Sequence, residues 1–487
     1  MDGLYHKVSR DPVHGEIKLM PLEILIVDTL PVQRLRFLSQ LAGAEFVYPG
    51  ATHTRFLHSL GTMHICGMYA QHLFKDPLKF TLLRLAGLLH DVGHGPYSHQ
   101  FDEVIFKEKL GITEGHDEYR KRIILEILPE EVDRRLKRIE DKRVLEGIRS
   151  QLQILGLSDS NIAESVFQLL KDVVEIYEGE TIGSVEFNIV QGPLGADRLD
   201  FVLRDSYFSG TRHFGTGALD RIVNHALIKD GNLLYNTKVI DDIYTVLFGR
   251  FMMYKNVYFH KTSRAVDLMI QRILRKAYRI LKLEERVKDL KDFLMLTDHG
   301  IFIEILHEAS KLVEKEELTS EEEELMEAFE TLHRLIRRDL WKLLIERPFT
   351  TRGIDPTVVS QGVAEDILNR MKKRIQEVLT KKDLPEQDRL KLIELLEKFE
   401  DFFVVDTPYK LTLVHPEEFT VNKVLLYDEK NDEVLSFEEF EAKNPAYRLL
   451  SNNLIQLVRV YTIEDVRRLL EKYDIVVETD VELTTRW

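Results

Sequence analysis

Apolar residues recur at three- and four-residue steps through most of the first 345 residues. In the segment DPLKFTLLRLAGLLHD these residues are Leu82, Leu85, Ala86 and Leu89. This period is typical of an amphipathic helix that packs on a core. The segments GADRLDFVLRDSYF and RFMMYKNVYFHKTSRAVDLMIQRIL repeat it. The spacing predicts a mainly α fold, with a multi-helical core over residues 1–345.

Two other segments of this part have different patterns. Pro12 and Gly15 in VSRDPVHGEIKL predict a turn or a short hairpin ahead of the helices. The charged stretch EKEELTSEEEELMEAFETLHRLIRRDL predicts a helix with a solvated outer face.

The pattern changes from about residue 400. DFFVV, KVLLYDEKNDEVLSF and QLVRVYT contain strand-like runs, and the second run is broken by a polar turn at Asn431. EDVRRLLEKY then predicts a helix and DIVVET a further strand. We therefore expect residues 346–487 to form a smaller mixed α/β lobe, with a role in oligomerisation or regulation.

Composition limits the environment and the partners of the chain. No apolar run approaches a membrane span, and the start MDGLYHKVSR lacks the apolar core of a signal peptide. The single cysteine, Cys66, excludes an intrachain disulfide and favours the cytoplasm. The net charge of −15 argues against nucleic acid as the main partner. Local cations could still bind a small polyanion.

The segment LLHDVGHGPYSH concentrates imidazoles and a carboxylate at the end of a predicted helix. His90 and Asp91 follow the apolar run, and glycines and a proline then stop the helix. Further ligands could come from His58 in THTRFLHSLGTMH and Asp197 in PLGADRLDFVLRDS. Two imidazoles and two carboxylates suit one divalent metal per subunit, such as Mn, Fe, Mg or Zn.

Each of these residues also has a purely structural interpretation. A lone histidine such as His58 is more often a hydrogen-bonded interior residue, and Asp197 could cap a helix or form a salt bridge. His90 and His94 resemble the four-residue spacing of a zinc-protease pair, but no glutamate follows His90 and glycines break the helix.

The order His58, His90-Asp91, Asp197 resembles the HD-domain metal phosphohydrolases. Within that superfamily the sequence is most similar to the deoxynucleoside triphosphate (dNTP) triphosphohydrolases, which include sterile-alpha-motif/HD-domain enzymes and bacterial dGTPase-like proteins. The segments GATHTRFLHSLG, LLHDVGHGPYSHQFD, GADRLDFVLRDSYFSG and VYFHKTSR carry the likeness from about residue 7 to 350, with echoes at QLVRVY. Since it starts almost at Met1, we expect no sterile alpha motif.

The resemblance implies hydrolysis between the 5′ oxygen of the deoxyribose and the α-phosphorus. It assigns the metal to His58, His90, Asp91 and Asp197. The residues implied at the α-phosphate and the leaving oxygen are His94, His99, His116, Asp117 and Asp102. His116-Asp117 matches the pair that protonates the leaving oxygen, a task that suits an imidazole. Which imidazole acts stays open at this point.

The resemblance also implies a substrate pocket. Its phosphate- and sugar-contacting residues would be Gln40, Leu41, Arg55, Arg198, Phe201, Asp205, Arg250, Tyr254 and Tyr258. A triphosphate needs such cations. Arg250, Tyr254 and Tyr258 recur every four residues, as on one helical face. Phe201 departs from the family, where a tyrosine stands beside the phosphates.

A second nucleotide site between subunits of a tetramer or dimer is implied too, with GTP or a dNTP as activator. Its positions would be Lys7, Val8, Asp28, Gln33, Arg36, Arg221, His260, Lys261 and Arg347. Arg10 replaces an asparagine of the family, and a basic pair expected shortly after Arg221 has no counterpart. Alternatively, residues 28–36 simply cap and pack a helix.

Three hypotheses for the function follow from the sequence. The leading one is a metal-dependent dNTP triphosphohydrolase. The second is an HD-domain phosphohydrolase that acts on nucleoside monophosphates or other phosphoesters and needs no arginine-lined pocket. The third is a non-catalytic nucleotide sensor or a binder of single-stranded nucleic acid, against which the intact histidines and the net acidity argue.

Overall fold

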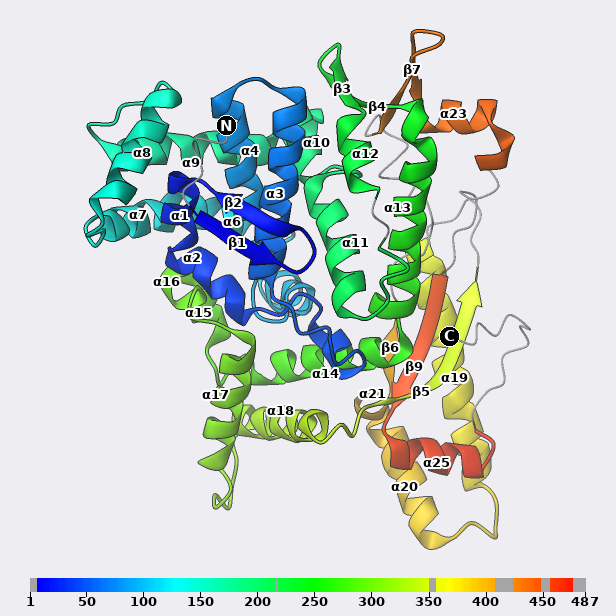
Figure 1. The fold of residues 1–487 in the computed structure, drawn as a ribbon. Coiled ribbons are helices and arrows are strands. Elements are labelled where there is room, and N and C mark those ends of the chain that lie inside the picture. Colours follow the sequence, from blue (N-terminus) through cyan, green and yellow to red (C-terminus); the bar gives the residue numbers. More distant parts are fainter. Residues whose placement is uncertain (1–6, 216–217, 350–355, 408–423, 448–455, 476–487) are drawn as a thin grey trace.

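The computed structural model describes residues 7–215, 218–349, 356–407, 424–447 and 456–475. In Figure 1 most of this chain is helical, and the few strands form small sheets at the periphery. The predicted mainly α fold is therefore confirmed. Among the described residues, no helix combines the length and apolarity needed to cross a membrane.

Helices make up most of the described chain. Up to residue 215 the helices are α1 (Pro21–Val27), α2 (Leu30–Arg34), α3 (Arg55–Leu73), α4 (Pro77–Leu89), α5 (His99–Phe101), α6 (His116–Arg122), α7 (Leu128–Leu136), α8 (Lys142–Ile154), α9 (Ile162–Glu178), α10 (Val185–Gln191) and α11 (Ala196–Phe208). From residue 218 they are α12 (Leu219–Asn224), α13 (Ile240–Met253), α14 (Lys261–Ala277), α15 (Leu283–Lys288), α16 (Leu290–Phe293), α17 (Asp298–Ser310), α18 (Ser320–Ile336), α19 (Pro356–Leu379), α20 (Glu386–Glu397), α21 (Phe399–Phe402), α23 (Phe437–Lys443) and α25 (Glu464–Lys472). Short 3-10 or π segments are η2 (Leu35–Phe37), η3 (Ala42–Phe46), η4 (Asp102–Lys109), η5 (Ile123–Ile127), η6 (Gly179–Ile182), η7 (Thr237–Val239) and η8 (Tyr254–Tyr258).

The described strands form three sheets. They are β1 (Lys7–Asp11), β2 (Gly15–Leu19), β3 (Ala226–Lys229), β4 (Asn232–Asn236), β5 (Lys342–Phe349), β6 (Val404–Asp406), β7 (Leu425–Asp428), β8 (Glu433–Ser436) and β9 (Gln456–Thr462). Strands β1 and β2 make the predicted hairpin, and the other sheets have the orders β3-β4-β7-β8 and β5-β9-β6. Neighbouring strands are antiparallel except β4 and β7, which pair in parallel.

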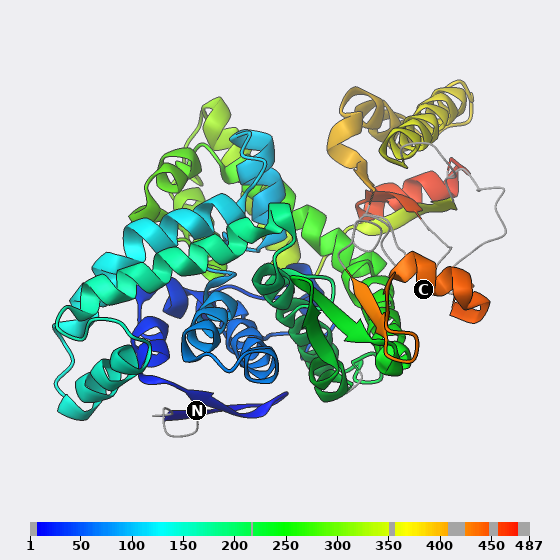
Figure 2. The same ribbon diagram turned by 90° about the horizontal axis from the view of Figure 1, so that it is seen from above.

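Helix α3 lies at the centre of the helical part. It packs along α4 and against α11, so that segments separated by more than one hundred residues lie side by side. The same three helices are neighbours in both ribbon views (Figures 1 and 2). Most residues of α3 are buried, including the polar Arg55, His58 and Thr62, as expected of a helix enclosed by other helices.

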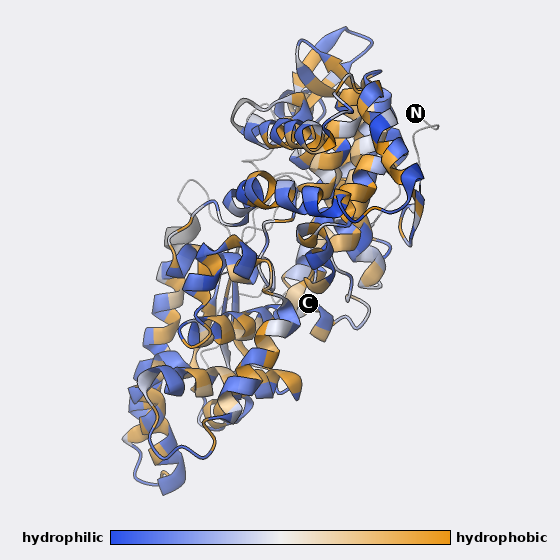
Figure 3. Cartoon of the chain, turned by 90° about the vertical axis from the view of Figure 1, so that its left-hand side faces the viewer, coloured by the Kyte–Doolittle hydropathy of each residue, from blue (hydrophilic) through white to orange (hydrophobic). Residues whose placement is uncertain are grey.

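Two large hydrophobic cores and one small apolar cluster organise the described residues. The larger one is built from the helices up to α18, and the smaller one joins α19, α20, α25 and the β5-β9-β6 sheet. The residues at β7, β8 and α23 belong to the larger core, although they come from the predicted C-terminal lobe. Apolar and polar positions alternate along the helices of both regions (Figure 3).

Most predicted elements are present, with some differences. The predicted helix over residues 250–274 is divided, because α13 ends in the π-helical η8 and α14 begins only at Lys261. His260 caps α14 by accepting a hydrogen bond from the Thr262 N–H, which fixes the break. Strand β5 was not predicted. The predicted strand DIVVET lies largely outside the described residues.

Candidate active site

The four residues predicted as metal ligands come together from three helices. His58 lies in the first turn of α3, His90 ends α4, and Asp197 lies in the first turn of α11. His58 Nε2 is 3.0 Å from Asp197 Oδ1 and 3.2 Å from His90 Nε2. One ligand atom of each of these three residues lies within 4.8 Å of the others.

Asp91 completes the group at its edge. Its Oδ1 lies 3.3 Å from His90 Nε2, and its Oδ2 lies 3.9 Å from His58 Nε2. The Oδ2 atom also accepts a 2.6 Å hydrogen bond from Arg55, the first residue of α3. Asp91 is therefore shared between the imidazoles and a buried guanidinium.

The chemistry of these donors fits a divalent cation. His90 Nδ1 contacts the Gly87 carbonyl at 2.8 Å and His58 Nδ1 contacts Asp200 at 2.8 Å, so both Nε2 atoms face the group. Burial lowers the pKa of His58, but Asp197 and Asp200 outweigh burial and raise the pKa to about 10. The site thus has an excess of negative charge that a cation would neutralise.

Three further imidazoles gather around one carboxylate beside this group. Asp102 Oδ2 lies 2.8 Å from His116 Nδ1, 3.3 Å from His99 Nδ1 and 3.4 Å from His94 Nδ1. His94 and His116 stack with ring centroids 3.7 Å apart. Since His94 Nε2 is also 3.4 Å from Asp91 Oδ1, the two groups form one continuous site.

The imidazoles differ in charge. Burial, and then Arg55, lower the pKa of His94 to about 4. The pKa of His116 is raised, because Asp102 outweighs the effect of burial. Asp102 itself has a pKa well below its usual range despite burial, since His94 and His116 favour its charged form. His99 is largely exposed, and Asp117 lies 3.8 Å from His116 Nε2 while binding Arg120 at 2.7 Å.

The predicted phosphate-contacting arginines lie on different helices. Arg55 is buried, where it binds Asp91 and also Ser98 Oγ at 2.7 Å. Arg198 is half-buried directly after Asp197 on α11. Arg250 of α13 lies 5.5 Å above the ring of Tyr254.

The predicted sugar-contacting residues form an aromatic wall with a buried carboxylate. Tyr258 donates a 2.5 Å hydrogen bond to Asp205, and its ring lies edge-on to Tyr254 at 4.9 Å. The ring centroid of Phe201 lies 6.5 Å from that of Tyr258. Leu41 packs in the small apolar cluster that includes Tyr258.

Two residues of this region were missed by the sequence analysis. His53 contacts Asp205 Oδ1 at 2.8 Å, stacks on Phe208, and accepts the Gln40 N–H at its carbonyl. Asp200 contacts the Nδ1 atom of His58. Both lie in the segments GATHTRFLHSLG and GADRLDFVLRDSYFSG, but only the folded chain shows their partners.

The residues predicted for a second nucleotide site occupy separate places on the subunit. Lys7 and Val8 are exposed on β1, and Asp28, Gln33 and Arg36 follow on α1 to η2. The remaining members lie on α12, at the start of α14 and on β5. No hydrogen bond or ion pair joins the first group to the rest within the described chain.

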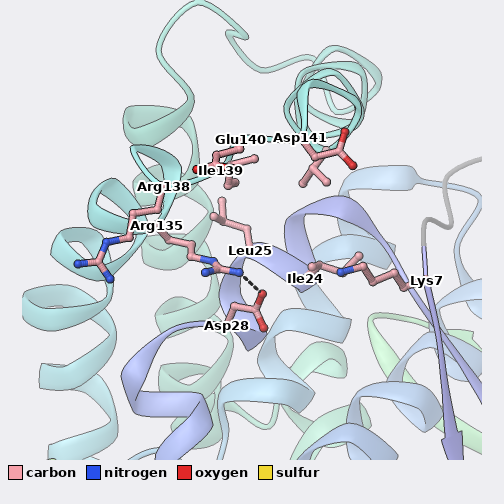
Figure 4. A pocket seen from close by; sticks show the side chains of 10 residues that line it. Lys7, Ile24, Leu25, Asp28, Arg135, Arg138, Ile139, Glu140 and Asp141 are labelled. Carbon is pink, nitrogen blue, oxygen red and sulfur yellow. Dashed lines mark hydrogen bonds and ion pairs between the residues drawn. The ribbon is translucent and has the colours of Figure 1, made fainter.

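Asp28 borders a surface cavity of about 190 Å³. Figure 4 shows the Arg135 guanidinium directed at the Asp28 carboxylate, with which it forms a 2.5 Å contact, while Lys7 lies on the other side. Gln33 donates to the Val27 carbonyl, and Arg36 donates to Gln33. These positions therefore also help to cap and pack α1 and α2.

Two segments of the chain match known protein families. Residues 55–154 match the HD domain, and residues 219–349 match an HD associated region. A deoxynucleoside triphosphate triphosphohydrolase SAMHD1 from Gallus gallus is 29% identical over 392 residues, which cover 74% of this chain and 60% of that protein. The homologue from Dictyostelium discoideum is 27% identical, with 74% and 64% covered. The chain thus spans less than two thirds of these relatives.

A further sequence relative covers part of the chain, and two solved structures match nearly the whole fold. An uncharacterized protein from Methanocaldococcus jannaschii is 31% identical, with 60% of this chain and 53% of that protein covered. A phosphohydrolase structure from Bacteroides thetaiotaomicron matches with a TM-score of 0.64, 20% identity and coverage of 94% and 99%. A hypothetical protein from Aquifex aeolicus has a TM-score of 0.60, 24% identity and coverage of 96% and 98%.

Proposed function

Because the chain is a member of the HD-domain phosphohydrolase superfamily, related to the dNTP triphosphohydrolases, we propose that it hydrolyses dNTPs to deoxynucleoside and intact triphosphate. This proposal rests mainly on one observation: the proposed metal ligands and the imidazoles around Asp102 form one continuous site. The His58-His90-Asp197 cluster and the imidazoles around Asp102 meet at Asp91. A phosphoryl group in this site would face metal ligands on one side and a proton donor on the other.

The four proposed ligands His58, His90, Asp91 and Asp197 would hold one divalent cation. When bound, this cation would supply Lewis acidity that polarises the phosphoryl group and favours attack by water. Asp200 and the Gly87 carbonyl hold the imidazoles of His58 and His90.

The proton chemistry is assigned to His116. In the reaction the oxygen of a water molecule bonds to the α-phosphorus and releases one proton to solvent, and the bond from that phosphorus to the 5′ oxygen breaks. The 5′ oxygen leaves as a strong base and needs a proton, which His116 would donate because Asp102 keeps it charged. His94 is neutral near pH 7 and would donate a hydrogen bond to the phosphate.

The arginines and the aromatic wall would hold the rest of the substrate. Arg55, Arg198 and Arg250 would bind phosphate oxygens, for which guanidinium groups are well suited. Asp205 orients the Tyr258 ring through its hydroxyl, and this ring would pack on the deoxyribose. A 2′ hydroxyl would have to displace the Tyr258 ring and the Asp205 carboxylate that holds it, so the pocket favours deoxyribose over ribose.

Assembly and activation are part of the same proposal. The separate second-site residues on one subunit favour a site completed by another copy, in a homotetramer or homodimer with GTP or a dNTP as activator. A nucleotide that binds Asp28 would first have to displace Arg135. The C-terminal lobe, residues 346–487, would serve assembly or regulation, and the enzyme would act in the cytoplasm.

The test is to identify the products. The Mn²⁺-loaded protein is incubated with each of the four dNTPs, alone and with GTP, and the products are separated by anion exchange. Deoxynucleoside and triphosphate are expected in equal amounts. Pyrophosphate or single phosphate as the product would refute this function, and turnover of deoxynucleoside monophosphates alone would favour the second hypothesis.

A further inference from the structure

We propose that Asp200 positions the His58 imidazole for metal binding, and that the N-terminal turn over residues 11–14 holds Asp200 in place. The inference rests on the proposed metal site but concerns residues outside its ligand set. Asp200 lies three residues after Asp197 on α11, about one helical turn away. Helix α11 thus carries both the proposed ligand Asp197 and the residue that supports the proposed ligand His58.

Asp200 is fully buried, and its two oxygens contact three side chains. Oδ2 lies 2.8 Å from His58 Nδ1 and accepts a 2.8 Å hydrogen bond from Arg204 Nε. Oδ1 lies 2.5 Å from His14 Nε2 and accepts a 3.0 Å bond from Arg204 Nη2. A carboxylate fixed in this way holds the proton of His58 on Nδ1 and leaves Nε2 as the metal-binding nitrogen.

The N-terminal turn supplies the outer part of this network. Asp11 Oδ1 accepts the backbone N–H groups of Val13 and His14, each at 2.9 Å, which shapes the turn. Asp11 Oδ2 accepts a 2.8 Å bond from Arg204 Nη1. The motif DPVH therefore does more than connect two strands, because it brings His14 and Asp11 onto the buried pair Asp200–Arg204.

Gly61 leaves room for the Asp200 carboxylate, because it has no side chain. It lies on α3, three residues after His58, and a Cβ atom there would be 1.9 Å from Asp200 Oδ1 and 2.4 Å from Arg204 Nη2. Glycine inside a helix costs about 1 kcal/mol relative to alanine. The steric conflict with Asp200 gives a physical reason for this unfavourable residue.

The experiment compares Asp200→Asn with the matched control Glu23→Gln in the full-length protein. Glu23 is equally buried and binds Arg84 through two hydrogen bonds of 2.5 and 2.8 Å, away from His58. Each change removes one buried carboxylate charge from an arginine. Co²⁺ affinity is measured by chelator competition, and both variants are also compared by thermal unfolding.

Asp200→Asn is expected to weaken Co²⁺ binding by about 10- to 100-fold. Glu23→Gln is expected to lower thermal stability and leave the Co²⁺ affinity unchanged. In Zn²⁺-loaded protein with ¹⁵N-labelled histidine, the Nδ1 proton of His58 should exchange slowly in wild type and in Glu23→Gln. It should exchange fast in Asp200→Asn.

His14 gives a second route in case Asp200→Asn does not fold. His14→Ala is expected to weaken Co²⁺ binding, and His14→Gln to restore part of it, because the glutamine amide can donate from a similar position. Equal Co²⁺ affinity of wild type, Asp200→Asn and His14→Ala would overturn the inference while leaving the metal site intact. A wild type that binds no Co²⁺ would overturn both this inference and the proposed metal site.

Discussion

His94 and His116 stack on each other and share Asp102, yet they differ in charge. His94 lies deeper and next to Arg55, so it stays neutral, whereas His116 is paired most closely with the carboxylate. An imidazole must be protonated before it can act as an acid, and neighbouring charges and burial set its pKa. The difference therefore supports His116 as the proposed acid.

This assignment predicts the pH dependence of the reaction. Since the pKa of His116 is raised, activity should hold through neutral pH and fall as the pH rises through that raised value. His116→Gln should lower kcat by about 10²- to 10⁴-fold. Asp102→Asn should move the alkaline limb of the kcat profile to lower pH, because it removes the charge that keeps His116 protonated.

Two controls accompany this prediction: the variant His94→Gln and the pH dependence of the free energy of unfolding. His94→Gln should affect KM and leave the alkaline limb in place, and an unchanged limb in Asp102→Asn would contradict the assignment. The His116–Asp102 pair should also stabilise the fold fully below pH of about 6.5, the ordinary value of histidine. This contribution should be lost as the pH rises through the raised pKa.

At the scale of elements, helix α17 supports the loop of the HD motif. Tyr97 and Ser98 both have positive φ angles, 58° and 56°, which are strained for residues with side chains. Asp298, the first residue of α17, accepts the Tyr97 N–H at 2.8 Å and both the N–H and hydroxyl of Ser39. Ser98 in turn binds Arg55, so α17 helps to place a proposed substrate arginine.

Asp298→Asn should therefore destabilise the protein by about 1–3 kcal/mol, because one buried acceptor becomes a donor that faces another donor. Urea unfolding measures this change, and an increase in KM should accompany it. Asp289→Asn is the matched control, since Asp289 is an exposed cap of α16 and asparagine caps equally well. Equal stability of the two variants would contradict the role given to Asp298.

At the scale of the whole molecule, the site joins parts of the chain that are far apart. The proposed ligands lie on α3, after α4 and on α11, and the network behind them includes the N-terminal turn. The larger core also includes β7, β8 and α23, so residues 424–447 pack with the helical part that contains the site. A cation that binds only the folded site should stabilise this whole assembly.

Excess Mn²⁺ at one hundred times its Kd should stabilise the protein by about 2.7 kcal/mol, and chelation should remove the gain. Thermal unfolding with and without Mn²⁺ measures the shift. Asp197→Ala should abolish this shift, whereas Asp133→Asn should retain it, because the Asp133 side chain is half exposed on α7. A Mn²⁺ shift of equal size in Asp197→Ala would argue against the proposed ligand.

The sequence by itself determined the helical core, the N-terminal hairpin and the meeting of His90 and Asp91 at the end of a helix. These features depend on residues within a few positions of one another, so periodicity and helix-stop signals are enough to predict them. Only the tertiary structure decided that Asp102 charges His116, that Asp200 supports His58 and that β7 pairs with β4. Charge states and strand partners depend on atoms that folding brings together from distant segments, and a local pattern carries no record of them.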